Sequence, residues 1–389
     1  MKQSKEYFKS FNELRAIACI LVFFYHTYKL VFLKNDTDSF IIHLIYFNGG
    51  NAVSFFFVLS GFLISYLLLN EIQNTDTVDV KGFYFKRIIR IWPIYYLVVL
   101  VVNVFLPLLF FMLNMKYTSV STLSTVFYLL ILPNLSRIIS DFGKLGHLWS
   151  IGVEEQFYFI WAPLVKFFKY SFLKLCLSII IIKFLLLILF QFLASNTYCN
   201  YVFLFLQQFK LEQMAIGGIG AYLIFNYKER VMRQSIFSVG GQIIISLILL
   251  LYLCLDEKVI TNQFFQKLYI FIFIDCGYLL MPVVYLYTIL NLSLNERAIF
   301  KLKNSFLNYL GKISYGFYIY HIFSILLVEF ILLKADLAKG TFIFNALFYT
   351  LSVSLNIIVS HLSFIYFESY FLKLRPSSGP VEIESERKV

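Results

Sequence analysis

Arg15 and His26 share one strongly apolar run near the start of the 389-residue chain, with ten residues between them. If residues 14–33 form a helix, this spacing comes to about three turns, and both side chains lie on one face, about 16.5 Å apart along the axis. A guanidinium and an imidazole are costly inside a membrane helix, which marks them as functional candidates. The pair predicts a site for a long anionic ligand, with its charge at Arg15 and its reactive end near His26. A neutral histidine in an apolar site is suited to act as a general base near neutral pH.

A second cationic pair, Arg87 and Arg90, stands three residues apart and shares one face of a predicted helix. Paired guanidinium groups suit phosphates, which they can bind with two hydrogen bonds each. Basic residues also anchor membrane helices at the cytoplasmic surface, and the spacing alone favours this simpler role. Both interpretations stay open from the sequence.

Glu154 and Glu155 follow each other at the predicted mouth of a later apolar run. One carboxylate there would orient or charge-stabilise an imidazole, and acidic side chains that stabilise a helix N-terminus are the simpler alternative. His147 is a second imidazole within two helical turns of Glu154. No HExxH or similar spacing accompanies it, so we expect no metal site. Structural or packing roles are expected for the remaining histidines, His43, His321 and His361.

The overall composition indicates an integral membrane protein, because 60% of the residues are hydrophobic, 20% are aromatic and only 14% are charged. Soluble domains carry about 25% charged residues. The net charge of +11 comes from short segments between apolar runs and not from a continuous basic stripe, which argues against nucleic-acid binding. The five cysteines show neither CxxC spacing nor an evident pairing, so we expect core hydrophobes and not a disulfide set.

The apolar runs predict an all-α, polytopic integral membrane helical bundle of about ten transmembrane helices. The runs fall at residues 14–33, 45–69, 91–113, 150–168, 175–194, 208–225, 236–255, 268–290, 309–333 and 341–365. Residues 1–366 are predicted to form one transmembrane domain, and residues 367–389 a short cytoplasmic tail. Gly217, Gly218 and Gly220 lie inside one run, where small residues favour close helix packing.

The lysines and arginines predict the orientation of the chain in the membrane. With the N-terminus in the cytoplasm, the inner segments hold roughly twice as many of them as the outer segments, in agreement with the positive-inside rule. Both termini are then cytoplasmic. Arg15, Arg87 and Arg90 lie at the inner side of the membrane, His26 in its outer half and Glu154 at an outer mouth.

Five sequence blocks, spread over nearly the whole chain, resemble the membrane acyltransferase type 3 family, whose members O-acetylate bacterial surface polysaccharides. The most specific block is HLWS at residues 147–150 followed by VEEQFY at 153–158. The other four are the run from Leu14 to His26 with its Arg-x10-His spacing, SFFFVLSGFLI at 54–64, RIIRIWP at 87–93 and SYGFYIYH at 314–321.

The resemblance implies an O-acetyltransferase of the bacterial cytoplasmic (inner) membrane that uses acetyl-CoA and a glycan acceptor, either lipid-linked or at the cell surface. Arg15, Arg87 and Arg90 would hold the phosphates of the donor. His26 would act as general base or take the acyl group itself, and Glu154 would orient or charge-stabilise it. The predicted acceptor-binding residues are His147, Trp149 and Glu155.

Two other functions fit part of this pattern. A transporter or flippase could line its path with Arg15 and His26, although transporters usually show paired broken helices and repeat symmetry, which are not evident here. A family member could also transfer its acyl group to a small secondary metabolite.

Overall fold

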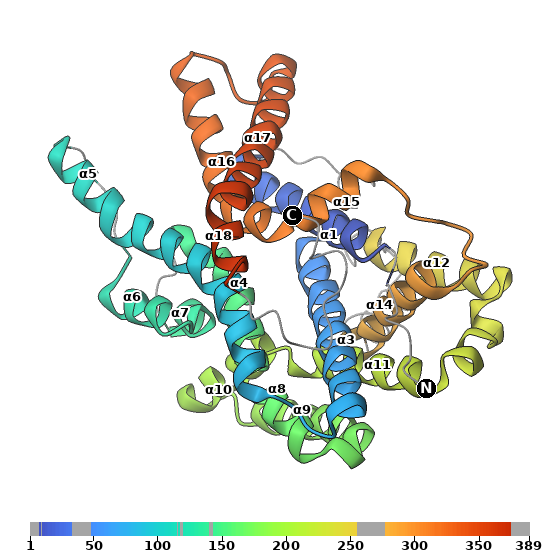
Figure 1. Ribbon diagram of the computed structural model, residues 1–389. Helices are drawn as coiled ribbons and strands as arrows, with labels where there is room; N and C mark the ends of the chain where they lie inside the picture. Colours follow the sequence, from blue (N-terminus) through green and yellow to red (C-terminus); the bar gives the residue numbers. More distant parts are fainter. Residues whose placement is uncertain are drawn as a thin grey trace. The chain divides into compact units, whose positions relative to one another are not determined.

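The computed structural model describes residue 8 and residues 10–32, 48–114, 116, 120–139, 143–254 and 277–374. These residues form helices and their connections, with no strand among them, so the predicted all-α class is confirmed (Figure 1). His43, Cys276 and most of the predicted tail lie outside the described residues.

Six helical segments within the described ranges are long and apolar enough to cross a membrane, which supports a multi-pass membrane protein. They are Phe11–Val31, Gly49–Thr75, Val80–Met112, Lys169–Phe192, Ser314–Lys334 and Phe342–Leu372, and Val239–Cys254 and Tyr278–Leu294 are shorter apolar helices. The predicted runs 150–168 and 208–225 are also helical, but α8 (Trp149–Phe167) and α11 (Leu211–Met232) carry more charged residues.

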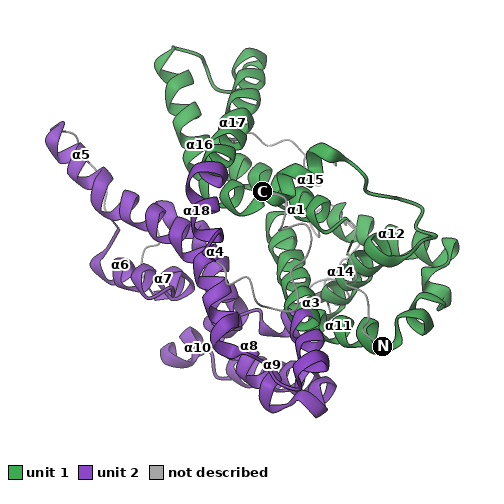
Figure 2. Ribbon diagram, in the orientation of Figure 1, with its two compact units in different colours: residues 1–66, 216–362, 381–389 green, residues 67–215, 363–380 purple. Residues whose placement is uncertain are grey.

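Two compact units divide the chain (Figure 2). Unit 1 comprises residues 1–66, 216–362 and 381–389, and unit 2 comprises residues 67–215 and 363–380. Each unit therefore combines segments that lie far apart in the sequence.

Helix α1 (Phe11–Thr27) lies at the centre of the contacts within unit 1. It packs against α14 (Gly277–Leu294), α15 (Ser305–Lys312) and α16 (Ser314–Lys334), as Figure 1 shows for α15. The approach of α15 is very close, because a Cβ atom at Gly311 would overlap the backbone of Asn12. Only glycine permits this contact, which joins the start of α1 to a segment near the other end of the chain.

Glycines also bring α3 (Gly49–Thr75) and α11 together. A Cβ atom at Gly217 would overlap the backbone of Val58 and Phe62, and one at Gly220 would meet Leu286 of α14. The predicted role of these glycines in close helix packing is therefore confirmed.

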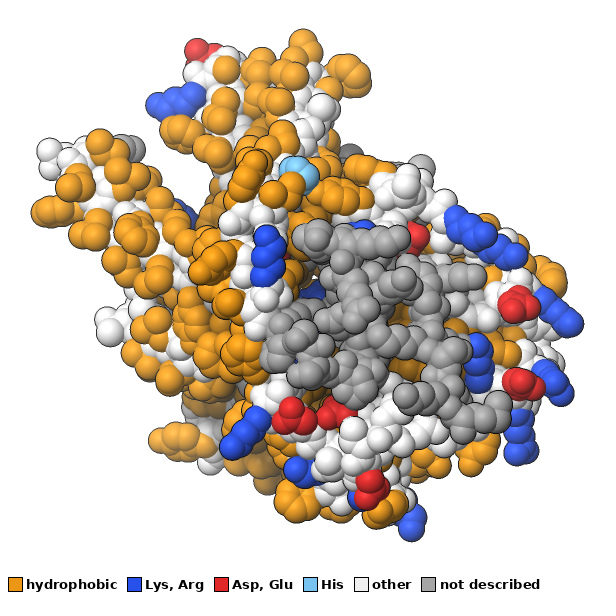
Figure 3. Space-filling model, viewed as in Figure 1, with side chains coloured by type: hydrophobic (Ala, Val, Ile, Leu, Met, Phe, Trp, Pro, Cys, Tyr) orange, Lys and Arg blue, Asp and Glu red, His pale blue; other side chains and the backbone are white. Residues whose placement is uncertain are grey.

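The remaining helices of unit 1 are α12 (Val239–Cys254) and α17 (Phe342–Ser363). Hydrophobic side chains cover the outer surfaces of α16 and α17 in Figure 3, as expected for helices in contact with lipid.

In unit 2, α4 (Val80–Leu100) packs against α8, which also contacts α7 (Pro133–Ile139), while α9 (Phe172–Phe192) packs against α10 (Thr197–Gln208). Tyr95 of α4 donates to the Tyr128 carbonyl at 2.9 Å, and Gln156 of α8 donates to Asn134 at 2.8 Å. Unit 2 also contains α5 (Leu106–Met112), α6 (Thr122–Leu129) and α18 (Ser369–Leu372). These contacts hold α4 and α8, which carry the polar motifs, side by side.

Candidate active site

His26 lies in the last turn of α1, and one of its ring nitrogens is held by two acceptors. Its Nδ1 atom lies 3.1 Å from the carbonyl oxygen of Val22 and 3.1 Å from Nε2 of His321 on α16. The ring centroids are 4.9 Å apart and the rings are tilted by 52°. We call His26 and His321 the histidine pair. It joins residues from opposite ends of the chain within unit 1.

The surroundings of His321 determine which nitrogen of each ring carries the proton. His321 is only 1% exposed, and its Nδ1 contacts the carbonyl oxygen of Tyr318, which can only accept a hydrogen bond. Neutral His321 therefore carries its proton on Nδ1 and presents Nε2 as an acceptor. His26 then donates from Nδ1, and its own Nε2 keeps the lone pair. That lone pair can take up a proton or attack an acyl carbon.

His321 is the site residue that the sequence interpretation missed, since a structural role was expected for it. The signal was present in the block SYGFYIYH, where Tyr318 and His321 are spaced to meet on one helix face. A single sequence does not show that this face meets α1, and the partner of His26 emerges only from the packing of α16 on α1.

Arg15 and His26 lie on one continuous α-helix, as their spacing predicts. Arg15 is half-buried in the second turn of α1, and Cys19 and Val22, between it and His26, are buried in the core of unit 1. The predicted arrangement, with a cation about three turns from an imidazole, is therefore present on α1.

Arg87 belongs to a compact polar group between α4 and α8 in unit 2. Its guanidinium carbon lies 5.6 Å from the ring centroid of Phe83 and 5.7 Å from that of Tyr158, within the range of cation–π attraction. Trp92 donates from Nε1 to Oε2 of Glu155 at 2.7 Å. Arg87 attracts the same carboxylate electrostatically. We call Arg87, Trp92, Glu155 and Tyr158 the Arg87 cluster.

Arg90 also has a carboxylate counterpart, which the sequence did not suggest. Glu368, at the end of the π-helical turn Phe364–Glu368, is 8% exposed and interacts electrostatically with Arg90. Each of the two arginines therefore interacts electrostatically with a carboxylate of unit 2, Arg87 with the half-buried Glu155 and Arg90 with the buried Glu368. Simple anchors at a membrane surface would not require such counterparts.

The motif that precedes α8 forms a 3₁₀ turn, Gly143–Leu148, in which His147 is 4% exposed. Helix α8 begins at Trp149, whose ring lies 5.1 Å from the guanidinium carbon of Arg137. Glu154 and Glu155 lie beyond the first turn of α8, which contains no acidic residue. Because the helix dipole acts mainly within the first turn, the simpler interpretation of these glutamates as dipole-stabilising residues does not fit.

The structure brings the predicted site residues together in two groups. Arg15 and His26 lie in unit 1 with His321, and the other six lie in unit 2: Arg87, Arg90, His147, Trp149, Glu154 and Glu155. The expectation that Glu154 orients His26 involves both units and stays a prediction. Within the described residues, no three His, Cys, Asp or Glu side chains lie close enough together to hold a metal ion.

Comparison with known proteins identifies the family. The model of the family described as an acyltransferase domain (acyltransferase 3) matches residues 8–363. A Staphylococcus aureus (strain COL) protein provisionally named an O-acetyltransferase is 27% identical over 387 residues, covering 94% of this chain and 58% of that protein. The chain thus spans little more than half the length of such curated relatives.

A shorter match reaches the peptidoglycan O-acetyltransferase OatA of Listeria monocytogenes, with 32% identity over 178 residues, 43% of this chain and 26% of OatA. The O-acetyltransferase OatA of Staphylococcus aureus is 29% identical over the same length. No solved structure matches the chain significantly. Since the family model matches more than nine-tenths of the chain and includes every predicted site residue, this chain belongs to the membrane acyltransferase 3 family.

Proposed function

We propose that this protein is a membrane O-acyltransferase that moves an acetyl group from cytoplasmic acetyl-CoA to a hydroxyl group of an extracytoplasmic or lipid-linked cell-surface glycan. The family match supports acyl transfer, and the name of the Listeria relative supports a glycan acceptor. The proposal includes about ten membrane spans with both termini cytoplasmic, in the inner membrane of a bacterium. The segment 367–389 is the proposed cytoplasmic tail.

The observation that carries this proposal is the hydrogen-bonded histidine pair, in which His26 donates from Nδ1 and so has Nε2 as its basic nitrogen. His26 removes the proton from the acceptor hydroxyl, and the oxygen attacks the thioester carbonyl carbon. The C–S bond then breaks, and the departing CoA thiolate takes the proton back from His26. In the two-step variant, Nε2 attacks the thioester carbonyl carbon and the C–S bond breaks to release the CoA thiolate. The acceptor oxygen then attacks the acetyl group on Nε2, the C–N bond breaks, and the thiolate takes the hydroxyl proton.

His321 is a positioning residue in this mechanism. When Nε2 of His26 takes up a proton, the ring becomes an imidazolium that donates from Nδ1 to the His321 acceptor at 3.1 Å. The carboxylate of a catalytic triad has the same relation to its histidine. A neutral imidazole gives weaker charge stabilisation than a carboxylate, and for this reason Glu154 is proposed as a charge-stabilising partner.

Arg15, Arg87 and Arg90 are the proposed ligands of the donor phosphates. Guanidinium groups bind phosphate oxygens through paired, charge-assisted hydrogen bonds, and each loses less on desolvation than an ammonium group. On the acceptor side, His147, Trp149 and Glu155 are the proposed contacts of the sugar.

The decisive experiment measures CoA release from acetyl-CoA, with a soluble glycan fragment as acceptor, by purified protein in lipid nanodiscs. His26→Ala should lower turnover by at least about two orders of magnitude, since it removes the base or nucleophile, while acetyl-CoA still binds. The matched control is His361→Gln on α17, where the histidine contacts Tyr309. Turnover that persists in His26→Ala would exclude its catalytic role.

A further inference from the structure

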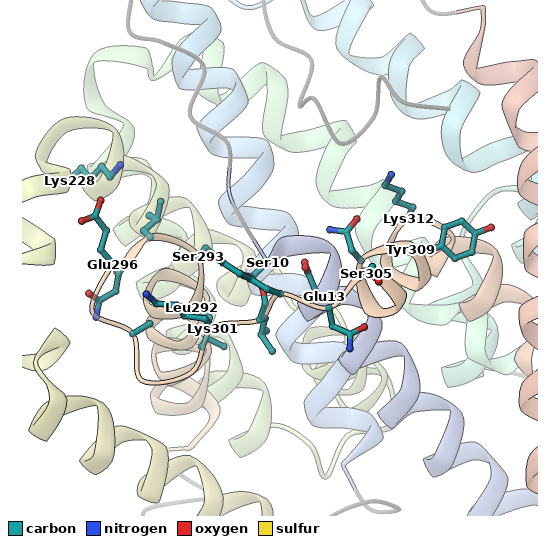
Figure 4. A pocket seen from close by; sticks show the side chains of 17 residues that line it. Ser10, Glu13, Lys228, Leu292, Ser293, Glu296, Lys301, Ser305, Tyr309 and Lys312 are labelled. Carbon is teal, nitrogen blue, oxygen red and sulfur yellow. The ribbon is translucent and has the colours of Figure 1, made fainter.

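A large cavity in unit 1 lies outside the residues assigned so far. It has a volume of about 890 Å³ and is bordered by the start of α1, the end of α14, the segment that follows and α15. Figure 4 shows Ser10 and Glu13 at its centre, with Lys228 and Glu296 toward one end and Tyr309 and Lys312 toward the other. Cavities of roughly 300–1,000 Å³ are typical of small-molecule sites.

The lining is cationic. Four lysines, Lys228, Lys301, Lys303 and Lys312, border the cavity, against the two carboxylates of Glu13 and Glu296. Ammonium groups at the rim of a cavity can turn toward the phosphates of a ligand and still contact solvent. The charge balance therefore favours an anionic ligand.

Glu13 gives a second and independent indication. It is only 5% exposed and lines the cavity, and its Oε2 atom is buried without a hydrogen-bond partner. The hydroxyl oxygen of Ser293, which also lines the cavity, is likewise buried without a partner. Buried acceptors of this kind are costly unless a donor reaches them. A ligand with N–H groups would supply such donors, whereas a bare phosphate would not.

The walls of the cavity are held in place before any ligand binds. Ser10 donates to the carbonyl of Leu302 at 3.1 Å, which ties the segment after α14 to the start of α1. Gln242, 2% exposed, accepts from the backbone N–H of Ile299 at 2.9 Å and donates to the Arg297 carbonyl at 3.1 Å. With the close contact at Gly311, these bonds give a preorganised site, which lowers the ordering cost of binding.

We propose that this cavity binds a phosphorylated nucleotide whose base carries an exocyclic amino group. The lysines bind the phosphate on the ribose, whereas the diphosphate is the proposed ligand of the arginines named above, and Glu13 accepts a hydrogen bond from the amino group. This inference rests on the proposed function, in which the ligand is the adenosine 3′-phosphate 5′-diphosphate end of acetyl-CoA. Glu13 and His26 lie about 20 Å apart along α1, a distance that an extended phosphopantetheine arm can cover.

The test uses the full chain in nanodiscs of zwitterionic lipid and two acyl donors, acetyl-CoA and S-acetyl-4′-phosphopantetheine, which lacks the nucleotide. The variant is Lys301→Gln/Lys303→Gln/Lys312→Gln, and Glu13→Gln is an isosteric second variant. The matched control is Lys81→Gln/Lys166→Gln/Lys174→Gln, since these exposed lysines lie outside the cavity and the charge change is the same.

We expect the cavity variants to weaken binding of adenosine 3′,5′-bisphosphate and to raise the KM for acetyl-CoA, each by about tenfold, while the KM for the truncated donor stays unchanged. Affinities equal to those of the control would overturn the proposal, even with normal acetyl transfer. If bisphosphate binding depends on these residues but no acyl transfer occurs, the cavity assignment stands and the proposed function fails. If the lysines affect only binding of added phosphatidylglycerol, they bind lipid headgroups and the nucleotide assignment is wrong.

Discussion

The histidine pair of unit 1 and the Arg87 cluster of unit 2 accommodate polar side chains in a largely apolar protein in different ways. The histidine pair is held by backbone carbonyls of the helices that carry it, those of Val22 and Tyr318. In the Arg87 cluster, side chains contact one another through aromatic faces, an indole N–H and a carboxylate.

This difference shows what each region is suited to do. Helix carbonyls cannot change their role as acceptors, so they hold the imidazoles in defined tautomers and leave one reactive lone pair. The Arg87 cluster instead compensates charge through mutual attraction between its side chains. The first arrangement suits proton transfer, and the second suits a charged ligand.

The largest effect is expected where the histidine pair is broken. His321→Leu removes the side-chain acceptor of His26 and leaves only the Val22 carbonyl, so kcat should fall by about 100-fold with little change in the KM for acetyl-CoA. His321→Gln offers an amide oxygen as acceptor and should restore part of the loss. Steady-state kinetics of both variants separates a positioning role from a role in folding. An equal loss of kcat in the Gln and Leu variants, with both of normal stability, would contradict the acceptor role.

The proposed role of the Arg87 cluster in donor binding is tested by the KM for acetyl-CoA. Arg87→Ala should raise the KM for acetyl-CoA by roughly one to two orders of magnitude. Arg87→Lys should restore little of it, because an ammonium lacks the planar face that lies against Phe83 and Tyr158. The exposed Arg230 gives the matched control, Arg230→Ala. An unchanged KM together with lower expression would show that Arg87 only anchors α4.

A smaller effect, on stability, is expected at Trp92. Trp92→Phe keeps an aromatic ring but removes the 2.7 Å hydrogen bond to Glu155, which should lower the free energy of unfolding by about 2 kcal/mol. In Glu155→Gln the neutral amide depends less on that donor, so the double variant should lose less than the sum of the single losses. Denaturant unfolding in mild detergent measures the cycle, and strict additivity would show that the bond contributes no coupling.

The smallest effect is expected at the exposed ion pair of unit 2, Asp76 with Lys169, 2.8 Å apart. The hydrogen bond and charge of Lys169 lower the pKa of Asp76 below its ordinary value. The resulting stability is present above the ordinary aspartate pKa and is lost as the pH falls through the lowered value. Asp76→Asn should therefore lower the melting temperature slightly at neutral pH, and the difference should shrink as the pH falls through the lowered pKa of Asp76. A difference that persists in acid would exclude the ion pair as its cause.

Periodicity and composition alone predicted the local features. The helix with Arg15 and His26, the i, i+3 placement of Arg87 and Arg90, and the packing role of Gly217 follow from spacing along one chain segment. Helices of this length satisfy their own backbone hydrogen bonds, so apolar runs specify them without reference to neighbours. The family also follows from the sequence, because its motifs are local.

Only the tertiary structure decided which polar side chains meet across the helices. His321 meets His26, Glu155 meets Trp92 and Glu368 faces Arg90 through helix contacts that join distant parts of the chain. The cavity beside Glu13 likewise needs α1, α14 and α15 together. In a sequence that is 60% hydrophobic, many helix faces offer similar apolar surfaces, so hydropathy does not specify which faces meet. Close approaches at glycines and buried hydrogen bonds make that selection, and they exist only once the helices have packed.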